Sequence, residues 1–152
     1  MWTEISTLPE YNYYGVYKIR LFDKKMNKPV VIPRFQNQDS DGILMIGHAS
    51  DIRNRIQTFR RAYQNGRAPH SEGRTLFLVR KFFYDQQFDD IYSLQYCFIK
   101  IGTKKEAEQT EEEQLQQYFR KFGEVPPLNA NLPGRDGWIE EIIEEERERE
   151  ER

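Results

Sequence analysis

Apolar residues recur along the sequence at two spacings, the alternating spacing of strands and the wider spacing of helices. The order in which these spacings follow one another restricts the fold more than any other feature. Three segments have the alternating or short unbroken apolar pattern that predicts strands: 13–22, 43–46 and 91–101. In the first of them, Tyr17 and Ile19 alternate with Lys18, which is typical of a half-buried strand. A polar loop without an obvious helix joins the first two strands, so we expect these strands to pair antiparallel.

The segments between and after the strands have apolar residues at helical spacing. Three such segments are predicted helices: 51–65, 75–84 and 104–122. Asp51 can cap the first helix, and Ile52 and Ile56 begin its apolar stripe. The second helix places Leu76 and Phe83 along one side. The order of elements predicts an α/β (α+β) protein with a three-stranded antiparallel sheet flanked by helices.

Length and composition predict one folded domain with a short appendage. The chain has 152 residues, 38% hydrophobic and 14% aromatic, which is enough to build a core. The only cysteine, Cys97, excludes an internal disulfide framework and a cysteine-based zinc site. No window approaches the roughly 18 apolar residues of a membrane span, and residues 1–4 do not resemble a secretory signal. We therefore expect a cytoplasmic protein that does not enter a membrane.

Charge is distributed unevenly along the chain. Residues 1–100 hold 15 Lys and Arg against 10 Asp and Glu, whereas residues 101–152 hold 8 against 15. The basic residues concentrate in one stretch: Arg53, Arg55, Arg60, Arg61, Arg67, Arg74, Arg80 and Lys81. Such an excess is expected of a surface that binds a nucleic-acid backbone. The alternative is a surface whose charge is balanced in three dimensions by the acidic end of the chain.

The acidic end is predicted to be a helical tail, residues 136–152, appended to a domain at residues 1–135. Four apolar residues could dock the first turns of this tail: Trp138, Ile139, Ile142 and Ile143. We expect the remainder to be frayed, since it is almost entirely charged. A tail of this kind can also be a binding site for a protein partner.

Glu111 is the most informative single residue. It lies on the apolar stripe of the third predicted helix, midway between Ala107 and Leu115. A carboxylate on an apolar face has to be neutralised by a proton, a cation or a metal. The alternative is a rim residue whose head reaches water. Arg55 falls at the edge of the stripe of the first helix, so the guanidinium and the carboxylate can face one another across the end of the sheet.

The order of these elements and their motifs resembles the GIY-YIG nuclease family over about residues 13–130. The matching positions are Gly15-Val16-Tyr17, Met45-Ile46-Gly47, Arg55 eight residues after Gly47, Glu111 seven residues before Tyr118, and Asn129. The resemblance implies a divalent-metal-dependent endonuclease that hydrolyses phosphodiester bonds of DNA. In such an enzyme Glu111 binds Mg²⁺ or Mn²⁺, and Arg55 contacts the phosphate.

The resemblance also implies roles for the residues around these two. Tyr17, together with His48, helps to activate water, and Asn129 positions the helix that carries Glu111. Residues predicted to contact substrate are Arg53, Arg60, His70, Arg74 and Asn129. For His70 the alternative is that it only caps the following helix.

Met45 departs from the family pattern, which has a tyrosine at this position. A thioether does not transfer protons or orient water strongly. Either Tyr17 with His48 supplies the base, or catalysis is impaired and the domain binds nucleic acid or a protein without cleaving it. A third hypothesis is an interaction protein that acts through the acidic tail.

Overall fold

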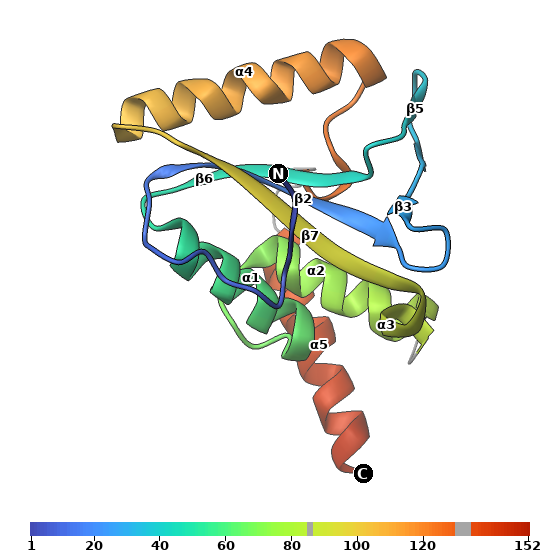
Figure 1. Ribbon diagram of the computed structural model, residues 1–152. Coiled ribbons are helices and arrows are strands. Elements are labelled where there is room, and N and C mark those ends of the chain that lie inside the picture. The colour runs from blue at the N-terminus through green and yellow to red at the C-terminus, as the bar shows by residue number, and fades with distance from the viewer. Residues whose placement is uncertain (85–86, 130–134) are drawn as a thin grey trace.

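The structure is a computed structural model that describes residues 1–84, 87–129 and 135–152, without the side chains of residues 84 and 135–139. An antiparallel sheet lies at its centre, and helices cover both faces of the sheet (Figure 1). The sheet contains β1 (Thr3–Glu4), β2 (Gly15–Asp23), β3 (Lys28–Pro29), β6 (Ile43–Ala49) and β7 (Tyr92–Lys100), and a separate ribbon contains β4 (Ile32–Pro33) and β5 (Gln38–Asp39). The helices are α1 (Ile52–Asn65), α2 (Ser71–Val79), the π-helix η1 (Arg80–Tyr84), α3 (Phe88–Ile91), α4 (Lys104–Phe122), the 3₁₀-helix η3 (Pro127–Asn129) and α5 (Arg135–Glu151).

β2 is the central strand of the sheet. β7 pairs with it along its whole length, from Gly15 opposite Lys100 to Asp23 opposite Tyr92. β6 pairs with the other side of β2, and both pairings are antiparallel. The predicted three-stranded antiparallel sheet is thereby confirmed. β1 and β3 extend it to five strands, and their two residues each are too few to show an alternating pattern in the sequence.

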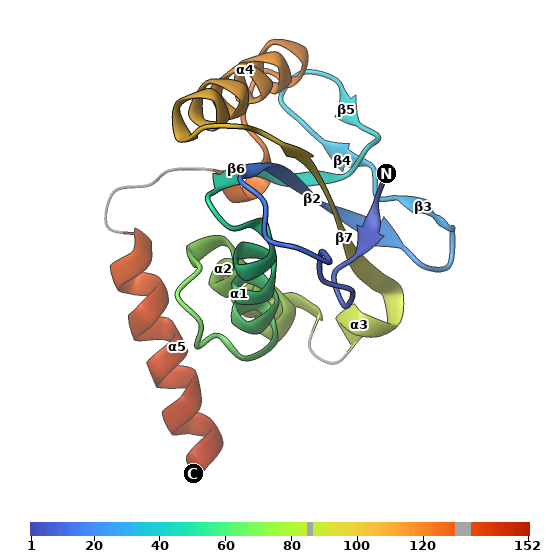
Figure 2. The same cartoon turned by 60° about the vertical axis from the view of Figure 1, so that its left-hand side comes forward.

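Alternate residues of β2 pack into two different cores. Tyr17 and Ile19 pack with residues of α1 and α2, among them Ile52, on one face of the sheet. Val16 packs with Ala107 and other residues of α4 on the opposite face. Figure 2 shows α1 and α2 together on one side of the sheet and α4 on the other. Neighbouring residues of a strand therefore serve different faces, which determines how the candidate site is divided.

α1 agrees with its prediction. The Asp51 side chain accepts a hydrogen bond from the N–H of Asn54 at 2.8 Å and caps the first turn. Ile52 and Ile56 are fully buried, as the predicted stripe requires. The helix ends at Gly66, whose φ of 72° is the left-handed conformation that glycine adopts without strain.

α2 differs from its prediction at both ends. It begins at Ser71 rather than at residue 75, because His70 caps it and supplies an earlier start. The prediction placed Phe83 along one side of the helix with Leu76, but Phe83 is 79% exposed whereas Leu76 is buried. The helix changes to the wider turn of η1 at Arg80, which shifts the angular position of every later residue.

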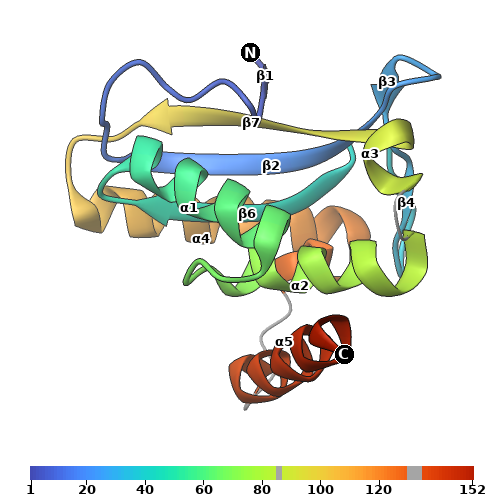
Figure 3. The same cartoon turned by 90° about the horizontal axis from the view of Figure 1, so that it is seen from below.

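α5 runs alongside α2 (Figure 3). Ile143 is buried against Leu78, with Ile142 and Phe77 beside them. Trp138 and Ile139, also predicted to dock, lie outside the described side chains. The helix continues to Glu151 instead of fraying after its first turns. A separate domain at residues 1–135 stays a prediction. No helix in the described part of the chain combines the length and apolar character needed to cross a bilayer.

Candidate active site

Tyr17 and Gly47 face one another across the pairing of β2 with β6. Tyr17 is only 3% exposed, and its ring lies over the position where Gly47 has no side chain. A Cβ atom on Gly47 would lie 2.8 Å from both Cζ and the hydroxyl oxygen of Tyr17. Glycine at the third position of the second motif therefore leaves the space that the phenol of the first motif occupies.

His70 holds the Tyr17 hydroxyl from the α2 side. Nδ1 of His70 accepts a hydrogen bond from the N–H of Gly73 at 3.2 Å, which caps α2. Nε2 lies 3.5 Å from the hydroxyl oxygen of Tyr17. Burial, and then the positive charge of Arg55, lower the pKa of His70 to about 4. The imidazole is therefore neutral at pH 7, its proton is on Nε2, and it donates toward Tyr17. The predicted capping role of His70 is confirmed.

Because His70 is neutral, its 3.3 Å approach to Glu72 is not an ion pair. Glu72 nevertheless belongs to the surroundings of Tyr17, since its carboxylate is among the groups that raise the pKa of Tyr17. The sequence contains only a faint signal for this residue: it is the single acid within the basic stretch from Arg53 to Lys81.

The pKa of Tyr17 reveals which charges surround its hydroxyl. Burial is the largest influence and raises this pKa above its ordinary value. Arg55 lowers it, and Glu72 and Glu111 raise it further. Arg55 and Glu111 therefore both lie within electrostatic reach of one hydroxyl, although they belong to different helices on opposite faces of the sheet. Tyr17 remains a protonated phenol at neutral pH.

His48 and Glu111 meet on the face of the sheet that α4 covers. His48 follows Gly47 in β6 and lies opposite Val16, so it faces α4. Its Nδ1 contacts Oε2 of Glu111. The side chains are 32% and 24% exposed, respectively, so water reaches both. Glu111 lies on the inner side of α4, as predicted, while its neighbours at 112 and 113 are exposed.

α4 is held in place by Tyr118, the tyrosine seven residues after Glu111. Its hydroxyl donates a hydrogen bond to Oδ2 of Asp39 at 2.8 Å. Asp39 is 1% exposed and also accepts hydrogen bonds from the backbone N–H groups of Asp41 and Ile43. This buried network links α4 to the start of β6, and it thereby sets the position of Glu111 relative to His48.

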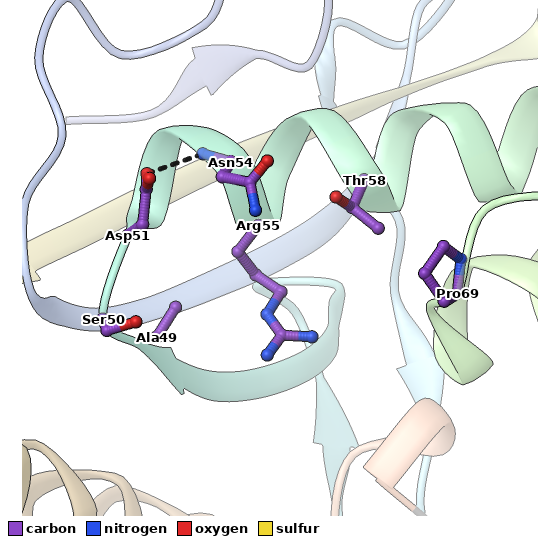
Figure 4. A pocket seen from close by; sticks show the side chains of 7 residues that line it. All are labelled: Ala49, Ser50, Asp51, Asn54, Arg55, Thr58 and Pro69. Carbon is purple, nitrogen blue, oxygen red and sulfur yellow. Dashed lines mark hydrogen bonds between the residues drawn. The ribbon is translucent and has the colours of Figure 1, made fainter.

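Arg55 is exposed and borders a polar cavity of about 210 Å³. The cavity is lined by Ala49, Ser50, Asp51, Asn54, Arg55, Thr58 and Pro69. Figure 4 shows the Arg55 side chain extending from α1 between Ala49 and Pro69. Within the described part of the chain, no hydrogen bond or ion pair occupies its guanidinium. A planar guanidinium left available in this way can form paired hydrogen bonds with a phosphate.

Three other arginines predicted to contact substrate are engaged inside the protein. Arg53 donates to the carbonyl oxygen of Pro9, and Arg60 donates to that of Ser6 at 3.1 Å. Arg74 forms an ion pair with Glu140 of α5 at 3.1 Å. Their role in substrate binding stays a prediction, and these contacts distinguish them from Arg55.

Asn129 uses its side-chain amide on the free edge of β6. Its Oδ1 accepts from the N–H of Ile46 at 2.8 Å, and its Nδ2 donates to the carbonyl oxygen of the same residue at 2.9 Å. The amide thus pairs with β6 as a neighbouring strand would. This geometry holds β6 in place directly before Gly47 and His48, and both polar groups of the side chain are already engaged.

Met45 lies opposite Ile19 in the strand pairing and is 3% exposed. It packs in the same core as Tyr17, on the α1 face. The position of the missing motif tyrosine is therefore filled by an apolar side chain, and Tyr17 has no second phenol beside it from β6.

Glu111 is the residue whose chemistry fits a divalent cation. Mg²⁺ prefers oxygen ligands, uses one or two carboxylates and keeps several waters. A partly exposed carboxylate with one oxygen in contact with His48 suits such an ion. The described residues contain no group of three or more His, Cys, Asp or Glu side chains that could hold a metal. The donor set thus fits a hydrated hard cation and not a tetrahedral zinc site with four protein ligands.

Comparison with known proteins agrees with this geometry. A family model described as "GIY-YIG domain-containing protein" matches residues 3–123. Searches of curated proteins and of solved structures found no match. The matched region contains both glycine-containing motifs, Arg55 and Glu111. The chain belongs to the GIY-YIG family, and at the level of that family it is a nuclease-type hydrolase.

Proposed function

We propose that this protein is a DNA endonuclease that hydrolyses phosphodiester bonds with one divalent cation, Mg²⁺ or Mn²⁺. The observation that carries the proposal is the set of groups around Tyr17. Arg55 lowers the pKa of its hydroxyl, Glu111 raises it, and the neutral imidazole of His70 lies 3.5 Å from it. A phosphate held at this point would meet a positive charge and a hydrogen-bond donor together.

Glu111 would hold the cation, and His48 would orient the carboxylate through its contact with Oε2. The bound cation supplies positive charge to the scissile phosphate and to the leaving 3′ oxygen. Arg55, which is exposed on α1, would offset the charge that develops on the phosphate in the transition state.

Tyr17 would orient the attacking water or the phosphate as a hydrogen-bond donor. Its raised pKa makes it a poor base at neutral pH, and donation from His70 leaves its own proton free to point into the site. His48 is the better candidate to accept the proton of the attacking water. It is partly exposed beside the metal-binding carboxylate, whereas His70 is buried and has a pKa of about 4.

The test is nicking of supercoiled plasmid with Mg²⁺ or Mn²⁺. We expect Glu111→Gln and Arg55→Gln each to lower the rate by about 10²-fold or more, the usual effect of removing one group that stabilises the transition state. Glu112→Gln and Arg61→Gln are matched controls, because these residues carry the same charges on exposed faces of the same helices. If the Glu111→Gln variant cleaves DNA at the same rate as the Glu112→Gln control, the proposal is refuted.

Met45 favours a second candidate function. The apolar side chain at the second-motif position is compatible with a domain that binds nucleic acid without cleaving it. Salt-sensitive DNA binding by the wild type, with no nicking in either metal, would support this candidate. A protein partner bound through the acidic tail also stays a prediction.

A further inference from the structure

The face of α2 and η1 that α5 covers is a basic stripe. Arg74 and Lys81 lie seven residues apart, about two helical turns, and both form ion pairs with α5. Arg74 pairs with Glu140, and Lys81 pairs with Glu150. Between these pairs Leu78 packs against Ile143. The carboxylates of the acidic helix α5 therefore pair with a line of cationic side chains that would otherwise face solvent.

The contact with α5 leaves the hydrogen-bond donors of Arg74 incompletely satisfied. Its side chain is 13% exposed, and one Nη atom pairs with Glu140. The Nε atom is buried without a hydrogen-bond acceptor among the described residues. A guanidinium is best satisfied by two parallel hydrogen bonds from a carboxylate or a phosphate. A phosphate group, with several oxygens, would offer acceptors to both Nη and Nε.

The stripe adjoins the candidate active site. Arg74 follows His70 by one turn of α2, and its backbone N–H donates to the carbonyl oxygen of His70 at 2.9 Å. His70 in turn contacts Tyr17. The stripe therefore begins one helical turn from His70, the residue that holds the Tyr17 hydroxyl. A nucleic-acid strand with a phosphate at Arg55 would have the stripe near this hydroxyl.

We propose that the Arg74–Lys81 stripe is a second docking surface for the phosphates of duplex DNA, and that α5 covers it with carboxylates that DNA must displace. The inference rests on the proposed function only in taking DNA as the ligand. It adds that the acidic helix competes with the substrate for a defined pair of cations, instead of acting through net charge alone.

The experiment measures binding of a fluorescently labelled duplex to the full chain in EDTA, by anisotropy, across a salt series. The test variant is Glu140→Gln with Glu150→Gln. The control is Glu141→Gln with Glu148→Gln, exposed residues of α5 that form no ion pair in the described part of the chain. Both variants change the net charge equally, so that a difference between them reports the cover itself.

Freeing two cations adds about two phosphate contacts, each of which contributes a slope of about 0.9 to the salt dependence. Raising salt from about 50 to 200 mM should therefore cost the test variant about tenfold more affinity than it costs the wild type. The control variant should keep the wild-type slope. Adding Arg74→Gln and Lys81→Gln to the test variant should return the slope to that of the wild type.

Equal slopes for the test and control variants, or no DNA binding by any variant, would overturn the inference. Plasmid nicking separates this outcome from that of the nuclease proposal. A test variant with a steeper slope and no nicking supports the covered surface and contradicts the nuclease. Nicking by the wild type without a change in slope supports the nuclease and contradicts the covered surface. Thermal denaturation monitored by circular dichroism checks that every variant is folded.

Discussion

The two halves of the candidate site lie on opposite faces of the sheet and have opposite physical characters. Tyr17 and His70, on the α1–α2 face, are each 3% exposed and are held in neutral forms. His48 and Glu111, on the α4 face, are 32% and 24% exposed. The burial that fixes the proton positions in the first half would make the entry of a hydrated cation difficult there. Under the proposed function a hydrated cation would enter the open half, so the division would separate positioning of a hydroxyl from binding of a metal.

The local cause of this division is the alternation of β6. Gly47 and His48 are consecutive, so their side-chain directions point to opposite faces. Gly47 leaves room for the phenol on one face, and His48 contacts Glu111 on the other.

Four predictions test whether the two halves differ as described. They are ordered by their expected effect on stability.

The largest effect is a pH dependence that belongs to His70 alone. The unfolded chain binds a proton at the ordinary histidine pKa of about 6.5, whereas the folded chain resists it until about pH 4. The stabilisation is therefore present above pH 6.5 and is lost as pH falls toward 4, by about 3 kcal/mol. His70→Asn retains a capping residue but should lack this loss.

The measurement is urea unfolding of wild type and His70→Asn at pH 7 and pH 4. Other carboxylates titrate over the same range, so the informative quantity is the difference between the two proteins. If both proteins lose the same free energy of unfolding, then His70 is not held neutral by its surroundings. The buried half of the site would then not differ from the open half as described.

Gly47→Ala should act on the buried half through sterics. The new methyl group would lie 2.8 Å from the Tyr17 hydroxyl, and overpacking of this kind costs about 2 kcal/mol. Nicking should fall with it, because the phenol must move. Gly102→Ala is the matched control, since its Cβ would only approach Oε2 of Glu106 at 3.7 Å. Urea unfolding and nicking of both variants measure the difference, and equal stability would contradict the proposed fit.

Tyr17→Phe keeps the ring and removes only the hydroxyl. Nε2 of His70 then loses its acceptor, and we expect a loss of about 1 kcal/mol in the free energy of unfolding. Nicking should fall by a larger factor than this stability change explains. A variant with wild-type nicking would show that the hydroxyl is not part of the catalytic machinery.

His48→Gln should have the smallest effect on stability, below about 0.5 kcal/mol, because its contact with Glu111 is partly exposed. Its effect on nicking should nevertheless be large, with a higher requirement for Mg²⁺ in a metal titration. A marked loss of stability with an unchanged metal requirement would contradict this prediction. His48 would then be a structural residue, and the open half would not be the metal site.

Much of the fold could be predicted from local pattern. The three main strands, α1 and the inward position of Glu111 on α4 follow from periodicity, because an amphipathic element shows which of its sides will be buried before its partner is known. The edge strands β1 and β3 are too short to leave such a pattern. Phe83 was misplaced because helical spacing was continued through η1, where the turn widens.

The sequence by itself determined which residue types are available for phosphate chemistry and on which sides of their helices they lie, since these properties depend on neighbours within a few residues. Only the tertiary structure decided the protonation state of His70, because its neutrality depends on burial and on the positive charge of Arg55, which belongs to a different helix. The same holds for the acidic helix. Its composition is apparent in the sequence, but its position on Arg74 and Lys81 depends on long-range packing between Leu78 and Ile143.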